Sequence, residues 1–124
     1  MLVSSGVDIV EVERIDRAIL RHGQRFFQRL YTANELVDSG GRTPALAARF
    51  AAKEAVAKAL GTGIGDVGWK EIEIIKGTHK EPILHLSGRA EEIASELRIT
   101  AWSISLSYTH EHAVAVAIGL RQGA

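Results

Sequence analysis

The chain has 124 residues and a mass of 13.4 kDa, which fits one domain spanning residues 1–124. Fifteen basic residues balance fifteen acidic ones, so no global charge attracts nucleic acid or a membrane surface, and no cysteine is present for disulfides, thiolate catalysis or zinc–thiolate sites. No apolar run is long enough to span a bilayer, and acidic residues interrupt the N-terminal segment where a signal peptide needs an apolar core, so we expect a soluble cytoplasmic protein.

Two patterns of apolar residues predict the secondary structure. Runs of β-branched residues and strict apolar–polar alternation indicate strands, whereas apolar residues three and four positions apart indicate helices. In chain order, we expect a strand at 2–12, a helix at 14–30, a short helix from 32 towards 39, a long helix at 45–60, strands at 69–75 and 82–86, a helix at 88–98, and strands at 102–107 and 113–120. This order predicts an α+β fold with a mostly antiparallel sheet and a long central helix.

Local signals set the ends of the helices. His22-Gly23 divides the first helix into two pieces, because glycine is unfavourable in a helix interior. Thr32 and Glu35 have the spacing of a capping box, and Gly61 ends the long helix. The glycine-rich loop 61–65 lacks the Lys-Ser/Thr ending of a phosphate-binding P-loop, so it is weak evidence for a nucleotide site.

Charged residues are conspicuous in two apolar segments. Asp8 lies in a strand pattern, where it must be paired, protonated or bound to a cation, unless it faces solvent on an edge strand. The long helix carries only four charged residues, Arg49, Lys53, Glu54 and Lys58. Glu54 and Lys58 have the favourable order of an i, i+4 ion pair, and the two cations before them would repel each other unless an anion lies between them. A solvated stripe and an anion site are both consistent with this pattern.

The first helix carries a basic stripe formed by Arg14, Arg17, Arg21 and Arg25. Spacings of three and four put the four guanidinium groups along one side of a helix. An acidic protein helix and nucleic acid are both electrostatic matches for the stripe, and a merely solvated face is the remaining interpretation. Aromatic residues make up only 6% of the chain and do not alternate with the basic ones, which disfavours nucleic acid.

Three segments occur in an order that is typical of one enzyme family. Residues 6–12 (GVDIVEV) are similar to its opening strand, residues 49–61 (RFAAKEAVAKALG) to its signature helix, and residues 103–109 followed by 113–115 to its C-terminal hairpin. Over nearly its whole length the chain thus resembles the holo-acyl-carrier-protein synthases, the small bacterial 4′-phosphopantetheinyl transferases. The resemblance implies the 4′-phosphopantetheinyl transferase-like fold and a homotrimer with coenzyme A between neighbouring subunits.

The resemblance also implies a reaction. The 4′-phosphopantetheine group of coenzyme A is transferred to a serine of apo-acyl carrier protein, 3′,5′-ADP is released, and the carrier is activated for fatty acid biosynthesis. Asp8 and Glu54 are expected to hold Mg²⁺, a hard cation that prefers one or two carboxylates with substrate phosphates and water, and Lys58 is expected to assist catalysis. The implied coenzyme A contacts are Arg49, Lys53, Lys58, Tyr108 and Thr109, and the implied carrier-docking residues are Arg14, Arg17, Arg21 and Arg25.

Two positions depart from the family pattern. Many relatives have a histidine where this chain has Tyr108, and neutral tyrosine is a poor base at pH 7, so the general base is left unassigned. His110 and His112 follow on a predicted turn, and no third metal ligand accompanies them. Relatives often have Gly-x-Pro where this chain has Lys80-Glu81-Pro82, which leaves the adenine and 3′-phosphate contacts open.

Two other functions remain to be separated from transfer. The main alternative is a binding module of the same fold that holds coenzyme A or a carrier protein without reaction. The loss of the histidine at Tyr108 favours it, whereas the retention of Asp8, Glu54 and Lys58 argues against it. A small RNA-binding module with an arginine-rich helix is the third interpretation, and zero net charge with few aromatic residues disfavours it. The preferred carrier and the tolerance of acyl-coenzyme A donors are open.

Overall fold

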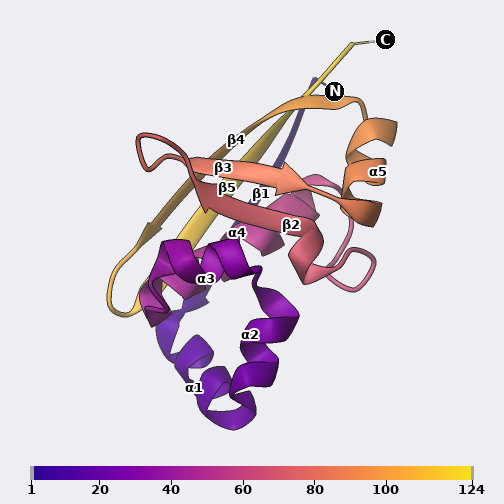
Figure 1. Ribbon diagram of the computed structural model, residues 1–124. Helices are drawn as coiled ribbons and strands as arrows, with labels where there is room; N and C mark the ends of the chain where they lie inside the picture. Colours follow the sequence, from indigo (N-terminus) through magenta and orange to yellow (C-terminus); the bar gives the residue numbers. More distant parts are fainter. Residues whose placement is uncertain (1, 124) are drawn as a thin grey trace.

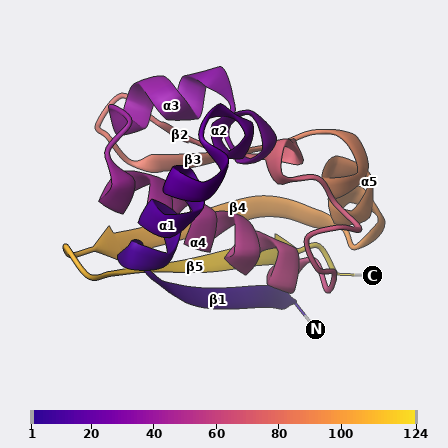
Figure 2. The same ribbon diagram turned by 90° about the horizontal axis from the view of Figure 1, so that it is seen from below.

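A long helix lies between two antiparallel sheets in the computed structural model, which describes residues 2–123 (Figures 1 and 2). The helix is α4 (Thr43–Ala59). On one side of it, the three-stranded sheet has the order β1-β5-β4, with strands β1 (Val3–Glu11), β4 (Ile99–Tyr108) and β5 (His112–Arg121). On the other side lies the hairpin of β2 (Ile72–Lys76) and β3 (Pro82–Leu86).

Shorter helices cover the ends of these layers. Three of them follow β1 and lie together at one end of the molecule: α1 (Val12–His22), α2 (Gln24–Leu30) and α3 (Ala33–Ser39) (Figure 1). The helix α5 (Gly88–Glu96) connects β3 to β4. The expected α+β fold with antiparallel sheets and a long central helix is confirmed.

Helix α4 is buried on almost every side because it is rich in alanine. The side chains of β5 that face it are also alanines, at 113, 115 and 117, and all are buried. Gly6 continues this surface on β1, where an added Cβ would collide with the carbonyl oxygen of Ala55. The sheet therefore approaches the helix closely, and polar side chains at the edge of this contact come within reach of each other.

The boundaries differ from the sequence-based expectation in two places. Residues 69–71 form a short 3₁₀ helix, η1 (Trp69–Glu71), in place of the first turn of a strand. The side chain of Glu71 accepts hydrogen bonds from the backbone N–H groups of Gly68 and Arg89, which stabilises this turn. Strand β4 begins at Ile99, three residues earlier than predicted, and the irregular pairing between Ile99 and Ala101 obscures its alternation.

The outer face of the three-stranded sheet is exposed, and along β1 and β5 it is largely apolar. It presents Val3, Val7, Ile9, Val114, Val116, Ile118 and Leu120, each at least 36% exposed. So large an apolar surface on a small protein indicates an interaction surface. Among residues 2–123, no helix is sufficiently long and apolar to cross a membrane.

Gly6→Ala tests the close packing of sheet on helix. The new methyl group has to displace β1 or the backbone of α4, so the free energy of unfolding should fall by at least about 2 kcal/mol. Gly63→Ala is the matched control, because nothing lies near its Cβ position, and its effect should stay within about 0.5 kcal/mol. Urea unfolding of both variants measures the difference. Equal stabilities would show that the sheet has room to move.

Candidate functional site

Asp8, Glu54 and Lys58 form one cluster where β1 crosses α4. Asp8 lies on the helix-facing side of β1 and keeps 20% of its side chain exposed. The Lys58 ammonium donates hydrogen bonds to the Asp8 carboxylate (3.1 Å) and to the backbone carbonyl oxygen of Val7 (2.9 Å). Glu54, one turn before Lys58, is half-buried on the same side of the helix. One interpretation of Asp8 was that it faces solvent on an edge strand. β1 is an edge strand, but the Asp8 carboxylate faces the helix and is paired with Lys58.

The electrostatics of this cluster favour a bound cation. Burial raises the pKa of Glu54, the negative charge of Asp8 raises it further, and the charges of Lys58 and Arg14 oppose this rise. The Glu54 carboxylate is therefore harder to ionise than an ordinary glutamate unless positive charge is added nearby. No third His, Cys, Asp or Glu joins a metal-binding group in residues 2–123. Two carboxylates without further protein ligands fit Mg²⁺ completed by phosphates and water, and do not fit a closed structural metal site.

Lys53 lies elsewhere, and its expected contact with coenzyme A is wrong. Its side chain is fully buried, and its ammonium donates to Glu35 Oε1 (2.8 Å) and to the carbonyl oxygens of Trp69 (2.9 Å) and Ile72 (2.5 Å). These three acceptors use all three N–H bonds of the ammonium. Burial lowers the pKa of Lys53, and the charge of Glu35 opposes that effect.

Arg49 is also buried, but it lines a pocket of about 270 Å³. Its guanidinium donates to the carbonyl oxygens of Ile74 (3.2 Å) and Ala45 (3.3 Å). Three more cations line the same pocket: Arg42, Lys76 and Lys80. Within the described part of the chain, none of these four cations has a carboxylate partner. Four unpaired positive charges around one small hollow make it a candidate site for a phosphate group.

The sequence analysis missed Arg42, Lys76 and Lys80. They have no periodic spacing, because two of them lie at the end and in the turn of the β2–β3 hairpin and the third precedes α4. The only signal for this pocket in the sequence was that Lys80-Glu81-Pro82 departs from the Gly-x-Pro pattern of the family. Lys80 has φ 64°, a left-handed conformation that suits glycine better.

Tyr108 and Thr109 lie at the end of β4. Tyr108 is 40% exposed and lines the pocket of the four cations. The Thr109 hydroxyl oxygen accepts hydrogen bonds from the backbone N–H groups of Glu111 (3.2 Å) and His112 (3.1 Å). The Thr109 O–H in turn donates to the carbonyl oxygen of His112 (3.5 Å), so the hydroxyl closes the turn predicted for the segment.

The two groups of candidate residues occupy different faces of one chain. Glu54 and Lys58 face β1, whereas Arg49 bonds to β2 on the other side of the helix. Five residues separate Arg49 from Glu54, which corresponds to roughly 140° around an α-helix.

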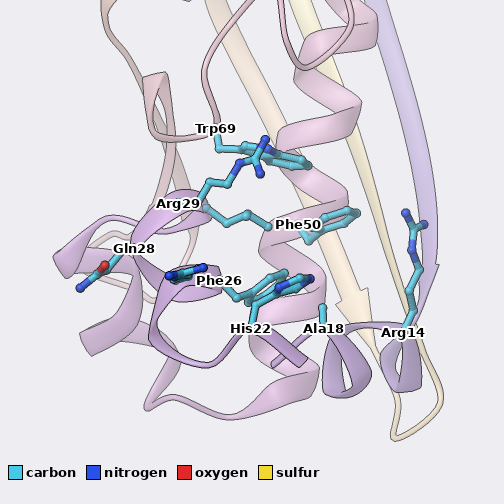
Figure 3. Close-up of a pocket in the computed structure, with 10 residues that line it drawn as sticks. Arg14, Ala18, His22, Phe26, Gln28, Arg29, Phe50 and Trp69 are labelled. Carbon is cyan, nitrogen blue, oxygen red and sulfur yellow. The ribbon is translucent and has the colours of Figure 1, made fainter. Parts of the chain in front are cut away.

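The expected basic stripe on one helix is partly wrong. Gly23, at φ 57°, ends α1, so Arg25 lies on α2 and only Arg14, Arg17 and Arg21 share a helix. A pocket of about 780 Å³ lies between these two helices, α4 and η1 (Figure 3). Arg14 and Arg25 line this pocket, and Arg17 and Arg21 line a neighbouring hollow.

The pocket between α1 and α2 combines positive charge with aromatic surface. Arg29, which the sequence analysis did not single out, contributes to its lining together with His22. Phe50 and Trp69 lie in its wall with ring centroids 4.9 Å apart (Figure 3). The Arg14 guanidinium carbon is 5.6 Å from the centre of the Phe50 ring, within cation–π range. The pocket suits a partner surface that combines acidic and apolar side chains.

Comparisons with known proteins point to one family of enzymes. The family model of the 4′-phosphopantetheinyl transferase superfamily matches residues 4–117. The holo-acyl-carrier-protein synthase of Herpetosiphon aurantiacus is 44% identical, with 97% of this chain and 99% of that protein covered. That of Carboxydothermus hydrogenoformans is 51% identical, with 94% and 95% covered.

Two solved structures have the same fold. The Helicobacter pylori holo-acyl-carrier-protein synthase in complex with coenzyme A has a TM-score of 0.84 and 31% identity, over 93% of this chain and 98% of that chain. The Neisseria meningitidis holo-acyl-carrier-protein synthase has a TM-score of 0.85 and 35% identity, over 98% of this chain and 100% of that chain.

Proposed function

The chain belongs to the 4′-phosphopantetheinyl transferase superfamily as a holo-acyl-carrier-protein synthase, and we propose that it acts through Mg²⁺-dependent sites shared between copies of the chain. The enzyme transfers 4′-phosphopantetheine from coenzyme A to apo-acyl carrier protein. The proximity of the Asp8 and Glu54 carboxylates is the observation that supports the metal requirement, because a bound cation would offset their mutual repulsion. We propose that the modified carrier serves fatty acid biosynthesis and that the reaction takes place in the cytoplasm.

The reaction requires positioning and charge neutralisation more than covalent help from the protein. The serine oxygen of the carrier forms a bond to the β-phosphorus, the bridging P–O bond breaks, and its electron pair leaves with 3′,5′-ADP while the serine proton passes to solvent water. When bound by Asp8 and Glu54, Mg²⁺ supplies positive charge to the phosphate oxygens. Lys58 is half-exposed and pairs with Asp8, so its ammonium can turn to a phosphate oxygen beside the breaking bond.

The pocket of the four cations is proposed for the adenosine end of coenzyme A. Arg49 is pre-oriented by two backbone carbonyl oxygens, and Arg42, Lys76 and Lys80 add positive charge for the 3′-phosphate. Tyr108 contributes ring surface and a hydroxyl donor at the same pocket. The Thr109 O–H makes only a long bond to the His112 carbonyl oxygen (3.5 Å), so it can rotate to donate to a phosphate oxygen while its own oxygen still accepts the two backbone N–H groups of the turn.

We propose that the sites are completed in a homotrimer. The carboxylate cluster of one copy must meet the cation pocket of another, and contacts between two different faces generate a closed ring in place of a two-fold dimer. Three copies make the smallest such ring. The exposed apolar face of β1 and β5 is available for burial at its centre.

The basic surface of α1 and α2 is proposed to bind the acidic carrier protein. Arg14 and Arg25 belong to the large pocket, and Arg17 and Arg21 extend the positive surface along α1. The carrier then presents its serine to the carboxylate cluster, since Arg14 is close enough to influence the pKa of Glu54.

Asp8→Asn and Glu54→Gln test the metal site. Each replacement keeps the volume of the side chain and removes the negative charge, so the transfer rate should fall at least about 100-fold while the melting temperature stays nearly unchanged. The readout is the mass of apo-carrier protein after incubation with coenzyme A and Mg²⁺. Glu91→Gln, an exposed change on α5, is the control. Full activity of either variant at saturating Mg²⁺ would show that the two carboxylates do not form the metal site. A wild-type protein that binds coenzyme A without modifying the carrier would be a binding module.

Mixed assemblies test whether each site is shared. Asp8→Asn and Arg42→Glu should each be nearly inactive alone, because each inactivates a different half of every site. In trimers assembled from equal amounts of the two variants, a site with both halves intact should form about a quarter of the time when copies combine at random. Activity measurements together with light scattering after size-exclusion chromatography check this. Mixed trimers without recovered activity would show that each site lies within one chain.

Charge reversal on α1 tests carrier docking. Arg14→Glu with Arg21→Glu should raise the Michaelis constant for the carrier at least about tenfold and weaken its dependence on salt, because attraction between exposed charges is screened by ions. Arg89→Glu on α5 is the control. A rise in the Michaelis constant for coenzyme A, with an unchanged value for the carrier, would contradict the assignment.

A further inference from the structure

A fully buried ion pair connects parts of the chain that take no direct part in the transfer. Glu35 on α3 and Lys53 on α4 are each 0% exposed, with 2.8 Å between the carboxylate and the ammonium. The second carboxylate oxygen of Glu35 accepts from the backbone N–H of Ile74 (2.9 Å), and its first also accepts from that of Thr32 (2.9 Å). Every polar atom of the pair thus has a partner.

A buried pair of this kind contributes little net stability. Removing two charges from water is expensive, and apolar residues of similar volume often make a core equally stable or more stable. Its distinctive contribution is geometric, because five hydrogen bonds of defined direction converge on one point. They join α3, α4, η1 and β2, which are separate elements of the chain.

These bonds end on the walls of two functional pockets. The Lys53 ammonium holds the carbonyl oxygen of Trp69, whose ring packs against Phe50 in the pocket between α1 and α2 (Figure 3). Glu35 holds the N–H of Ile74, while the carbonyl oxygen of the same residue accepts from Arg49 in the cation pocket. Lys53 also directly precedes Glu54 on α4.

The two walls are supported unequally. Arg49 has a second bond, to Ala45 on its own helix, that does not depend on the ion pair. The segment around Trp69 is a single 3₁₀ turn after a glycine-rich loop, and Lys53 bonds to its first residue and to the residue directly after it. Loss of the ion pair should therefore displace the Trp69 wall more than the cation pocket.

We infer that Glu35 and Lys53 are positioning residues that hold the Trp69 wall of the carrier pocket against α4. They act through the Trp69 backbone and not on coenzyme A. This inference rests on the proposed binding of the carrier protein at that pocket. It assigns to the pair a role in recognition of the protein substrate, separate from the role of Glu54 at the metal.

The test separates position from stability. Lys53→Met leaves the Glu35 carboxylate buried without its cation, so the melting temperature should fall strongly. The double variant Lys53→Met/Glu35→Gln removes both charges and should recover most of that loss. Its Michaelis constant for the carrier should nevertheless stay at least tenfold above that of the wild type, with the value for coenzyme A within twofold. In a Trp102→Phe background, the fluorescence of Trp69 should shift to longer wavelength in the double variant.

Two further variants keep the result decisive. Trp69→Ala should raise the Michaelis constant for the carrier by a similar factor, and adding it to the double variant should raise the constant no further, because both changes remove the same wall. Tyr31→Phe removes a buried hydrogen bond to the Leu46 carbonyl oxygen without touching Trp69, and it should leave both constants unchanged. If the double variant does not fold, Trp69→Ala and Tyr31→Phe still decide whether the wall serves carrier recognition.

Three results would overturn the inference. Full recovery of carrier recognition along with stability in the double variant would make the pair purely structural. A change confined to the Michaelis constant for coenzyme A would show that Lys53 contributes to coenzyme A binding. A Trp69→Ala variant with a normal Michaelis constant for the carrier would remove the wall from recognition. Wild-type protein that transfers nothing to the carrier would instead contradict the proposed function, and the Trp69 fluorescence shift would still report on the wall.

Discussion

The close approach of the three-stranded sheet to helix α4 is the constraint on which the site depends. Gly6 presents no side chain where β1 meets the Ala55 carbonyl oxygen, and the buried alanines of β5 continue the same thin layer. Small residues on both surfaces remove the bulk that usually separates a sheet from a helix. Asp8, two residues beyond Gly6 on the same face of its strand, is thereby brought to Glu54. The proposed Mg²⁺ site depends on this proximity, because it would use both carboxylates.

Two adjacent charged residues of α4, Lys53 and Glu54, lie in different environments. Lys53 points into the core, where Glu35 and two carbonyl oxygens neutralise and bond its ammonium. Glu54, the next residue, lies beside the sheet, where burial and the negative charge of Asp8 raise its pKa against the opposing charges of Lys58 and Arg14. One helix thus carries a completed ion pair and an incomplete cation site side by side. The Lys53–Glu35 pair fixes the geometry of the elements around it, whereas the Glu54 carboxylate remains available to a ligand.

The separation of the carboxylates from the cation pocket is the basis for the proposal that the sites are shared between copies of the chain. Arg49 bonds to β2 and Lys58 bonds to β1, on different sides of the same helix. A ligand with phosphates at both ends of its nucleotide portion can bridge such surfaces when they belong to neighbouring copies. In the proposed trimer, the exposed apolar face of β1 and β5 is available for burial between copies, and the basic surface of α1 is available to the carrier.

The sequence by itself determined the features that depend on neighbours along the chain. The Thr32–Glu35 capping box, the helix break at Gly23, the strand alternation and the family pattern around Glu54 are local, and the α+β fold followed from their order. Only the tertiary structure decided which charges are buried. The helical pattern of the sequence does not distinguish Lys53 from Lys58, and the difference comes from their partners on other elements, Glu35 and Asp8. The tertiary structure also decided the cation pocket and the Trp69 wall. Their members come from loops and turns without periodicity, so only packing against α4 brings them together.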